Sequence, residues 1–218
     1  MTTKNQNAII ACGNTHSVAI MSDKTIRCWG DNSWNQYNTV YHYFTFTSTI
    51  QTIVNWFRSF VLFFDQHEDK HLTDVIQVYC GASHSVALLS NGTIQCWGNN
   101  LWNQCDPVHL TFTDVIQVVC NRKHSVALLS NGTVRCWGDN HWNQCDPVHL
   151  TFTDVVQVAC GAKHSVALKS NGTVRCWGEN EYNQCDPVHL TFTDVIQVAC
   201  GCHHSVVVLS DGTVLCWG

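Results

Sequence analysis

Cysteine and histidine recur with three residues between them at five places in the chain, as at Cys160 and His164. Thiolate and imidazole are ligands that structural zinc prefers, but a zinc site needs about four ligands around one point. Copies that are spread along a repeating chain do not converge in this way. The pattern therefore favours a structural interpretation, with Cys160 as a small buried side chain and His164 as a hydrogen-bonded strap at a turn. We expect no metal.

A serine follows each of these histidines, and such a pair could suggest nucleophilic catalysis. A serine nucleophile needs a general base and a third group that orients the base. The serines recur with the repeat instead and bring no orienting group with them; they include Ser85, Ser125, Ser165 and Ser205. The sequence also has no glycine loop of the kind that cradles phosphate. We predict a protein that is not an enzyme and that holds no cofactor.

The chain contains 14 cysteines, which in a secreted protein would indicate a disulfide framework. Residues 1–7 are polar and show no signal-peptide pattern, so we expect free thiols and a cytoplasmic or nuclear location. Within its hairpin, Cys176 is expected to lie opposite Ala167, which leaves no cysteine pair inside the hairpin. A disulfide from Cys160 to Cys185, or to a cysteine of a neighbouring repeat, is the alternative.

The sequence is organised as tandem repeats. One histidine returns every 40 residues, at His84, His124, His164 and His204. Within one repeat, apolar and β-branched runs predict three antiparallel strands at 75–80, 84–89 and 93–98. Alternation at 108–113 predicts a weaker fourth strand at the outer edge. No helical period appears, so each repeat is a small sheet that buries its faces only against its neighbours, as in a β-propeller.

Each predicted hairpin has its own turn signal. Asn91-Gly92 is the strongest short signal for a hairpin, because both central residues of a tight turn are expected to have positive φ. The first repeat carries Ser22-Asp23-Lys24-Thr25 at this place and lacks the glycine. We therefore expect a looser turn in the first repeat than in the others.

These elements predict an all-β fold, a single propeller domain over residues 1–218 with about six blades, one of them incomplete. The repeats run approximately over residues 7–36, 37–74, 75–114, 115–154, 155–194 and 195–218. The second repeat is degenerate, since Arg58 occupies the histidine position and the Cys-Trp-Gly strand is missing. If the ring closes, the strands near Ile9 and Val214 must lie together.

Charge and hydropathy argue against two kinds of partner. The net charge is −5 and the pI is about 6.2, whereas proteins that grip nucleic acid electrostatically carry a positive field. The longest apolar stretch, residues 53–64, contains Arg58 and is shorter than the roughly 20 residues that cross a bilayer. We expect neither nucleic acid nor a membrane as partner.

The repeat resembles that of the regulator of chromosome condensation (RCC) family. The matching residues of one repeat are Gly161, His164, Ser165, Gly172, Val174, Trp177, Gly178 and Gln184. The resemblance implies a β-propeller, in this family usually of about seven blades with longer repeats. It also implies a second candidate function, guanine-nucleotide exchange on a Ran-like small GTPase. The chain departs from the family in repeat length, in repeat number and at Asn183, where the family has glycine.

Positions that differ between the repeats of this chain gather in two loops, the turn before each histidine and the loop after each Trp-Gly. Because strands alternate in direction, both loops fall on one rim of the propeller, opposite the Asn-Gly hairpins. Binding residues are often carried by loops on a rigid scaffold. We predict that this rim binds a protein partner through Arg122, Lys123, Lys163, His203, Asp139, His141, Glu179, Glu181, Trp102 and Trp142.

Three further interpretations stay open beside this one. The differences between repeats could be neutral variation at exposed sites. A secreted form could inhibit an extracellular enzyme, and an open ring with exposed sheet edges would favour self-association. Trp97, Trp137 and Trp177 are expected to pack between blades rather than to bind a partner.

Overall fold

The computed structural model of the chain describes residues 10–34, 72–105, 112–145, 152–186 and 192–218. In these ranges the regular secondary structure consists of β-strands alone. The strands form five antiparallel sheets of three strands each, which confirms the all-β class. The strands are β1 (Ile10–Cys12), β2 (His16–Ile20), β3 (Ile26–Gly30), β4 (Val75–Cys80), β5 (His84–Leu89), β6 (Ile94–Gly98), β7 (Val115–Cys120), β8 (His124–Leu129), β9 (Val134–Gly138), β10 (Val155–Cys160), β11 (His164–Lys169), β12 (Val174–Gly178), β13 (Val195–Cys200), β14 (Ser205–Leu209) and β15 (Val214–Trp217).

The middle strand of an internal sheet is buried on both faces, as its continuous apolar run predicts. In β5, Val86 and Leu88 pack against the sheet that follows in the chain, whereas Ala87 packs against the sheet that precedes it. All three side chains are fully buried. Each sheet is therefore stabilised only by its neighbours on either side, which is the packing of a repeat array.

The hairpin turns differ from the expectation in their backbone conformation. Only the glycine of the Asn-Gly pair has positive φ, 77° at Gly172. The amide of Gly172 donates to the carbonyl of Lys169 at 3.0 Å, and the amide of Lys169 donates to the carbonyl of Thr173 at 2.9 Å. This is a type I turn followed by a left-handed residue, the usual three-residue hairpin loop. Asn171 suits it because its Oδ1 accepts hydrogen bonds from Thr173.

The longer turn shifts the strand register by one residue from the predicted pairing. Cys176 lies opposite Val166, not opposite Ala167, because the loop holds one residue more than a two-residue turn. His164 pairs with Gly178 at the other end of the same strands. The prediction that no cysteine faces Cys176 across the hairpin is unaffected.

The expectation of a looser turn in the first repeat is wrong. Lys24 adopts a φ of 64°, in the left-handed region that its glycine counterparts occupy. Its amide donates to Met21 at 2.9 Å, and the amide of Met21 donates to Thr25 at 2.8 Å, as in the other repeats. Asp23 takes the asparagine's part by accepting hydrogen bonds from Thr25. These contacts hold the same turn with a residue that has a side chain.

Side-chain amides link the first strands of neighbouring sheets. Gln117 on β7 donates from Nε2 to the carbonyl of Val158 on β10 at 3.0 Å, and its Oε1 accepts the amide of Val158 at 3.0 Å. Gln157 forms the same two bonds with Val198 on β13. In two sheets, one glutamine thus satisfies backbone groups of the next sheet that no strand pairs with. It also fixes the spacing of consecutive sheets.

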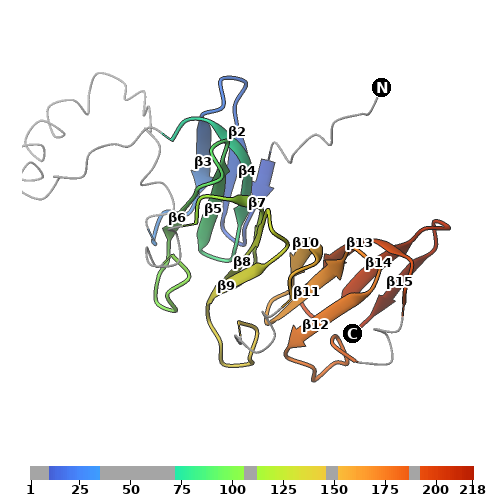
Figure 1. Ribbon diagram of the computed structural model, residues 1–218. Helices are drawn as coiled ribbons and strands as arrows, with labels where there is room; N and C mark the ends of the chain where they lie inside the picture. The colour runs from blue at the N-terminus through green and yellow to red at the C-terminus, as the bar shows by residue number, and fades with distance from the viewer. Residues whose placement is uncertain (1–9, 35–71, 106–111, 146–151, 187–191) are drawn as a thin grey trace, which may run out of the picture.

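The five sheets follow one another in an open array (Figure 1), and the two end sheets do not meet. The chain therefore shows five three-stranded repeats without closure, and the expected total of about six blades is not confirmed. Most of the degenerate repeat at 37–74 and of the fourth strand at 108–113 lies outside the described residues. In the described ranges, no helix is long and apolar enough to cross a membrane.

Candidate functional site

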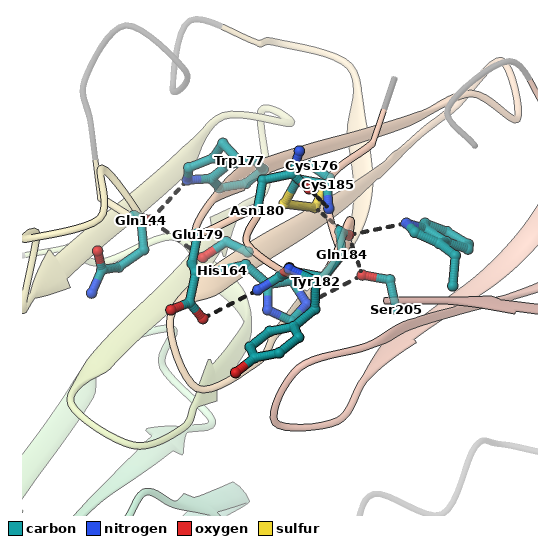
Figure 2. The surroundings of a disulfide bond; sticks show 12 residues. Gln144, His164, Cys176, Trp177, Glu179, Asn180, Tyr182, Gln184, Cys185 and Ser205 are labelled. Carbon is teal, nitrogen blue, oxygen red and sulfur yellow. Dashed lines mark hydrogen bonds between the residues drawn. A yellow bond between two sulfur atoms is a disulfide. The ribbon is translucent and has the colours of Figure 1, made fainter. Parts of the chain in front are cut away.

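Buried histidine–serine contacts join each sheet to the next. Nε2 of His124 lies 3.1 Å from Oγ of Ser165, and the pair His164 and Ser205 repeats that distance (Figure 2). The hydroxyl of Ser205 donates in turn to the carbonyl of Gln184 at 3.0 Å. A serine has one hydrogen to donate, so Nε2 of His164 carries the proton that the hydroxyl accepts. The partner serine comes from the next repeat, so the histidine is the structural strap predicted from sequence.

Burial controls the protonation of these histidines. Removal from water lowers the pKa of His84 to about 3, and the neighbouring His124 and His16 add to this effect. For His124 and His164, desolvation is again the main cause and lowers the pKa to about 4. The rings are therefore neutral at physiological pH, which suits a single N–H donor and not an acid–base catalyst poised near pH 7.

The predicted packing role of the repeated tryptophans agrees with their burial. Trp137 and Trp177 are 2% and 3% exposed. The indole of Trp177 donates to the carbonyl of Gln144 at 2.8 Å (Figure 2), and that of Trp137 donates to Gln104 at the same distance. Each tryptophan thus binds the loop of the preceding repeat and places that loop on the rim.

The loop after each Trp-Gly is a compact unit. Asn143 has a φ of 60° and occupies the position where the RCC pattern has glycine. Asparagine is one of the few residues that tolerate this left-handed region. Asn183, which replaces the family's glycine, therefore keeps the left-handed conformation, with a φ of 63°. The side chain of Asn140 accepts the amide of Cys145 at 2.8 Å, and the side chain of Gln144 accepts the amide of Trp142 at 2.9 Å.

A disulfide closes this loop in three repeats and corrects the expectation of free thiols for six of the 14 cysteines, whereas the other eight are free as expected. The pairs are Cys96–Cys105, Cys136–Cys145 and Cys176–Cys185, with Cα atoms 5.0–5.1 Å apart. The alternative pairing of Cys160 with Cys185 is therefore wrong. Cys160 is a free buried thiol whose pKa burial raises well above its ordinary value, as expected for an apolar packing residue. The structure places the loop cysteine against the third strand, a proximity that strand patterns alone do not give.

The loops and turns together line a groove on the predicted rim. Its walls are Trp102, Arg122, Lys123, Asp139, His141, Trp142, Ala162 and Lys163, and its volume is about 520 Å³. We call it the rim groove. Each loop meets the turn of the following repeat, so that Nζ of Lys123 lies 4.4 Å from the ring centre of Trp102. Lys163 makes the same contact with Trp142, also at 4.4 Å.

Two acidic residues of the rim, Glu179 and Asp139, are buried beneath basic side chains. Glu179 is 2% exposed. Its Oε1 forms an ion pair with Nζ of Lys163 at 2.7 Å, and its Oε2 lies 3.5 Å from Nδ1 of His203. Asp139 is 8% exposed and bonds to the ring of His141. Burial opposes ionisation of Asp139, but hydrogen bonds from His141 and the nearby positive charges outweigh it and lower the pKa. The groove therefore presents lysine, arginine and aromatic groups, while its buried carboxylates pair with Lys163 and His141.

The structure brings together seven of the ten residues predicted for the rim, namely those that line the groove. Glu179 lies beneath the groove, and Glu181 is exposed outside its lining. His203 makes an edge-to-face contact with Tyr182, with ring centres 5.1 Å apart, at the place of the lysine–tryptophan contacts. Ala162, one of the positions that differ between the repeats, was not among the ten predicted residues, but it is buried in the groove wall. In the described ranges, no group of three or more histidine, cysteine or acidic residues could hold a metal ion.

Comparison with protein families matches five segments of the chain to the "Regulator of chromosome condensation (RCC1) repeat". The segments are residues 8–36, 75–103, 115–144, 155–184 and 195–218, more than half of the chain. The comparison with curated proteins found no match.

Solved structures show the same fold at low identity. Prp20p of Saccharomyces cerevisiae, studied together with its binding to Gsp1p and histones, is 19% identical with a TM-score of 0.66 over 95% of this chain and 56% of its own. Human WBSCR16 is 22% identical, with a TM-score of 0.66 over 99% of this chain and 63% of its own. The ectodomain of the Arabidopsis thaliana receptor kinase ACR4 is 21% identical, with a TM-score of 0.65 over 96% of this chain and 66% of its own. This chain thus spans between about half and two thirds of the length of these proteins, and the likeness places it among the β-propellers.

Proposed function

Because the chain belongs to the RCC1 repeat family, we propose that it is a non-enzymatic module whose rim groove binds a protein partner. The observation that supports this function is the groove itself, in which side chains from three consecutive repeats converge. Three features rigidify it, namely the disulfides, the histidine–serine contacts and the tryptophan hydrogen bonds. A preformed surface loses little conformational entropy when it binds.

The partner that fits this groove carries acidic side chains. Arg122 is exposed, and Lys123 and Lys163 are half-buried above the tryptophan rings. The carboxylates of Asp139 and Glu179 are buried beneath and already paired. A carboxylate from a partner would meet cations that are held in place, while the tryptophan rings offer apolar area, a combination common in binding hot spots.

Reversal of the groove charge tests this function. The wild type, the double variant Arg122→Glu/Lys123→Glu and the double variant Arg135→Glu/Arg175→Glu would each be used to capture proteins, which mass spectrometry then identifies. Arg135 and Arg175 are exposed but lie on the third strands of their sheets, away from the groove. Their double variant therefore changes the net charge by the same amount as the groove variant and serves as its control. We expect the groove variant to weaken partner binding by at least about tenfold. Equal loss in both double variants, or no loss in either, would contradict the assignment.

A second candidate is nucleotide exchange on a Ran-like small GTPase. The fold similarity to Prp20p, a protein studied for its binding to Gsp1p, favours this candidate. Release of a fluorescent guanine nucleotide from a Ran-like GTPase, measured with and without the protein, separates it from the first. Acceleration at substoichiometric protein supports exchange, whereas binding without acceleration supports the module.

The compartment in which the protein works decides the state of its loops. In the cytoplasm or nucleus, the location expected from the sequence, the three cysteine pairs would be kept reduced. In an oxidising compartment they would be disulfides, as in the structure. Alkylation of the protein isolated from its natural source, followed by mass measurement, would count the free thiols and distinguish the two.

A further inference from the structure

The cations of the rim groove differ in how far carboxylates of this chain neutralise them. Nζ of Lys163 forms an ion pair with Oε1 of Glu179 at 2.7 Å, and Nε2 of Gln184 donates to Oε2 of the same carboxylate at 3.1 Å (Figure 2). Among the described residues, Arg122 and Lys123 form no ion pair. Arg122 is exposed and Lys123 is half-buried. The free positive charge of the groove is therefore concentrated at a single turn.

The corresponding turns of the neighbouring repeats lack this charge. The residues in the place of Arg122 and Lys123 are Ala82 and Ser83, Ala162 and Lys163, and Cys202 and His203. Only the lysine and the histidine among them can carry positive charge, and both face Glu179, at 2.7 Å and 3.5 Å from its oxygens. A carboxylate from outside the chain therefore meets two unpaired cations at Arg122 and Lys123 and at no other of these turns.

A second hollow adjoins the rim groove, because Trp102, Asp139 and His141 line both. Its volume is about 340 Å³, and its wall includes Leu101, whose counterparts in the next two repeats are His141 and Glu181. Leu101 is 70% exposed, more than any other large apolar side chain in the described ranges. We call this the leucine hollow. It offers apolar area directly beside the cationic turn, with the ring of Trp102 shared between the two.

We propose that the rim groove binds an extended acidic segment of its partner, which places a carboxylate on Arg122 and Lys123 and an apolar side chain in the leucine hollow. This inference rests on the protein-binding function proposed above and specifies the chemistry of the partner. Charge complementarity supports the carboxylate, since arginine clusters are a recurring means of recognising acidic motifs. Cover of the exposed leucine supports the apolar neighbour, because it removes apolar area from water. Two adjoining hollows of this size hold a few side chains, which one segment can supply.

The charge distribution favours a protein segment over a nucleic acid at this place. A nucleic acid carries a charge at every nucleotide and binds through many cations at once. Here two unpaired cations lie near the buried carboxylates of Asp139 and Glu179, and the chain has a net charge of −5. The groove therefore has a seat for one carboxylate and lacks the continuous positive track that a polyanion needs.

Selection from a library of random peptides displayed on phage, with the intact protein immobilised, tests the proposal without knowledge of the partner. We expect the selected peptides to share an aspartate or glutamate close to a large apolar residue. The best peptide is then synthesised with a fluorescent label, and anisotropy measures its Kd. Replacement of its acidic residue by the amide, or of its apolar residue by glycine, should each weaken binding by about tenfold. No enrichment, or a consensus without an acidic residue, would overturn the proposal.

Protein variants assign each half of the peptide to its own subsite. Arg122→Gln/Lys123→Gln should remove the preference for the acid over its amide and keep the preference for the apolar residue over glycine. Leu101→Ser, at an exposed position, should do the reverse. The matched control Arg135→Gln/Arg175→Gln, which removes two exposed charges outside the groove, should bind the peptide like the wild type. Variants that weaken all peptides equally would show that the two subsites are wrongly assigned.

Two further outcomes separate this inference from the binding function on which it rests. If no peptide binds but Arg122→Glu/Lys123→Glu still weakens partner capture, the extended segment is wrong while the groove remains the binding site. If that variant captures partners as well as the wild type does, both fail. A labelled oligothymidylate that binds as tightly as the best peptide, and that depends on the same two cations, would identify the ligand as nucleic acid and would also overturn the inference.

Discussion

The histidine that begins the middle strand is buried in four of the five sheets, with one ring nitrogen bonded and the other without a partner. Nδ1 of His84, His124 and His164 is buried and has no hydrogen-bond partner. Gly161 lies so close that a Cβ there would meet the ring of His164, which explains the glycine at that position. The neutral ring can leave Nδ1 unprotonated, whereas an imidazolium would leave a buried N–H and a charge without a partner.

We predict that stability falls as the pH drops below the ordinary histidine value of 6.5. Because burial lowers the pKa of His84 to about 3 and of His164 to about 4, the unfolded chain binds protons first. Stability from these groups is therefore complete above pH 6.5 and is lost from pH 6.5 down to about 3 for His84 and about 4 for His164, by up to about 1.4 kcal/mol per pH unit for each histidine. Urea unfolding between pH 7.5 and 4.5 measures this slope.

The variant His164→Gln is the control for this pH dependence. Glutamine keeps an amide N–H near Ser205 but does not titrate. We expect the variant to be less stable at neutral pH and to lose less stability on acidification than the wild type. An unchanged slope would show that other groups cause the acid sensitivity.

Lys24 is the one hairpin residue that departs from glycine, and its replacement should stabilise the protein. A non-glycine residue at a φ of 64° is strained, and glycine relieves the strain but loses more chain entropy on folding. We expect Lys24→Gly to raise the free energy of unfolding by about 0.5–1 kcal/mol. The reverse change, Gly212→Lys, places a side chain at a φ of 87° with no atom within 4 Å of its Cβ. It should destabilise by a similar amount, and a gain there would refute the conformational explanation.

The residues that could be predicted from the sequence are those whose role is set by the repeat. The histidine strap and the packing tryptophans follow from what the repeats share, and the groove-lining lysines follow from the positions at which the repeats differ. The contacts that join different repeats could not be predicted in detail, because they depend on how one sheet lies on the next. Gln157, which bonds to Val198 on the next sheet, reads as an ordinary strand residue until that packing is known.

In three repeats, the loop after Trp-Gly combines a left-handed asparagine, a disulfide and a buried glutamine in a few residues. Its cysteines are nine residues apart, which is a short closed loop. The sequence predicted the strands on each side of it, because alternation and burial set them locally. It did not predict the disulfide, because the loop path back to the third strand depends on Asn140 and Gln144 side chains that hold the backbone.

Removal of one such disulfide should loosen the groove and lower stability. The double variant Cys136→Ser/Cys145→Ser frees a loop whose closure contributes about 2–3 kcal/mol in the chain-entropy estimate. The loop also carries Trp142, so we expect weaker partner capture at the groove. Thermal unfolding of the variant, compared with the wild type with and without reductant, measures the effect. The variant should no longer gain from oxidation at this loop, and an equal Tm for variant and oxidised wild type would contradict the prediction.

The whole molecule is an array in which each sheet depends on its neighbours. Four apolar clusters lie between the five sheets, each built from the strands of two sheets or more. The sequence predicted this stacking because a three-stranded sheet with two apolar faces has no other way to bury them. It did not predict how the array ends, since closure depends on small rotations between sheets that accumulate along the array and that no local pattern records.

The tryptophan series measures this dependence within one chain. Trp137 is 2% exposed, fills the contact between two sheets and donates to Gln104, whereas Trp29 occupies the same repeat position in the first sheet and is 45% exposed. We expect Trp137→Ala to lower the free energy of unfolding by about 3–5 kcal/mol, and Trp29→Ala to lower it by less than about 1 kcal/mol in dilute protein. Urea unfolding with hydrogen exchange would show whether the loss at Trp137 spreads to the sheets on both sides. Equal losses at the two positions would mean that the tryptophan stabilises its own sheet, and that neighbouring sheets are not what holds the array together.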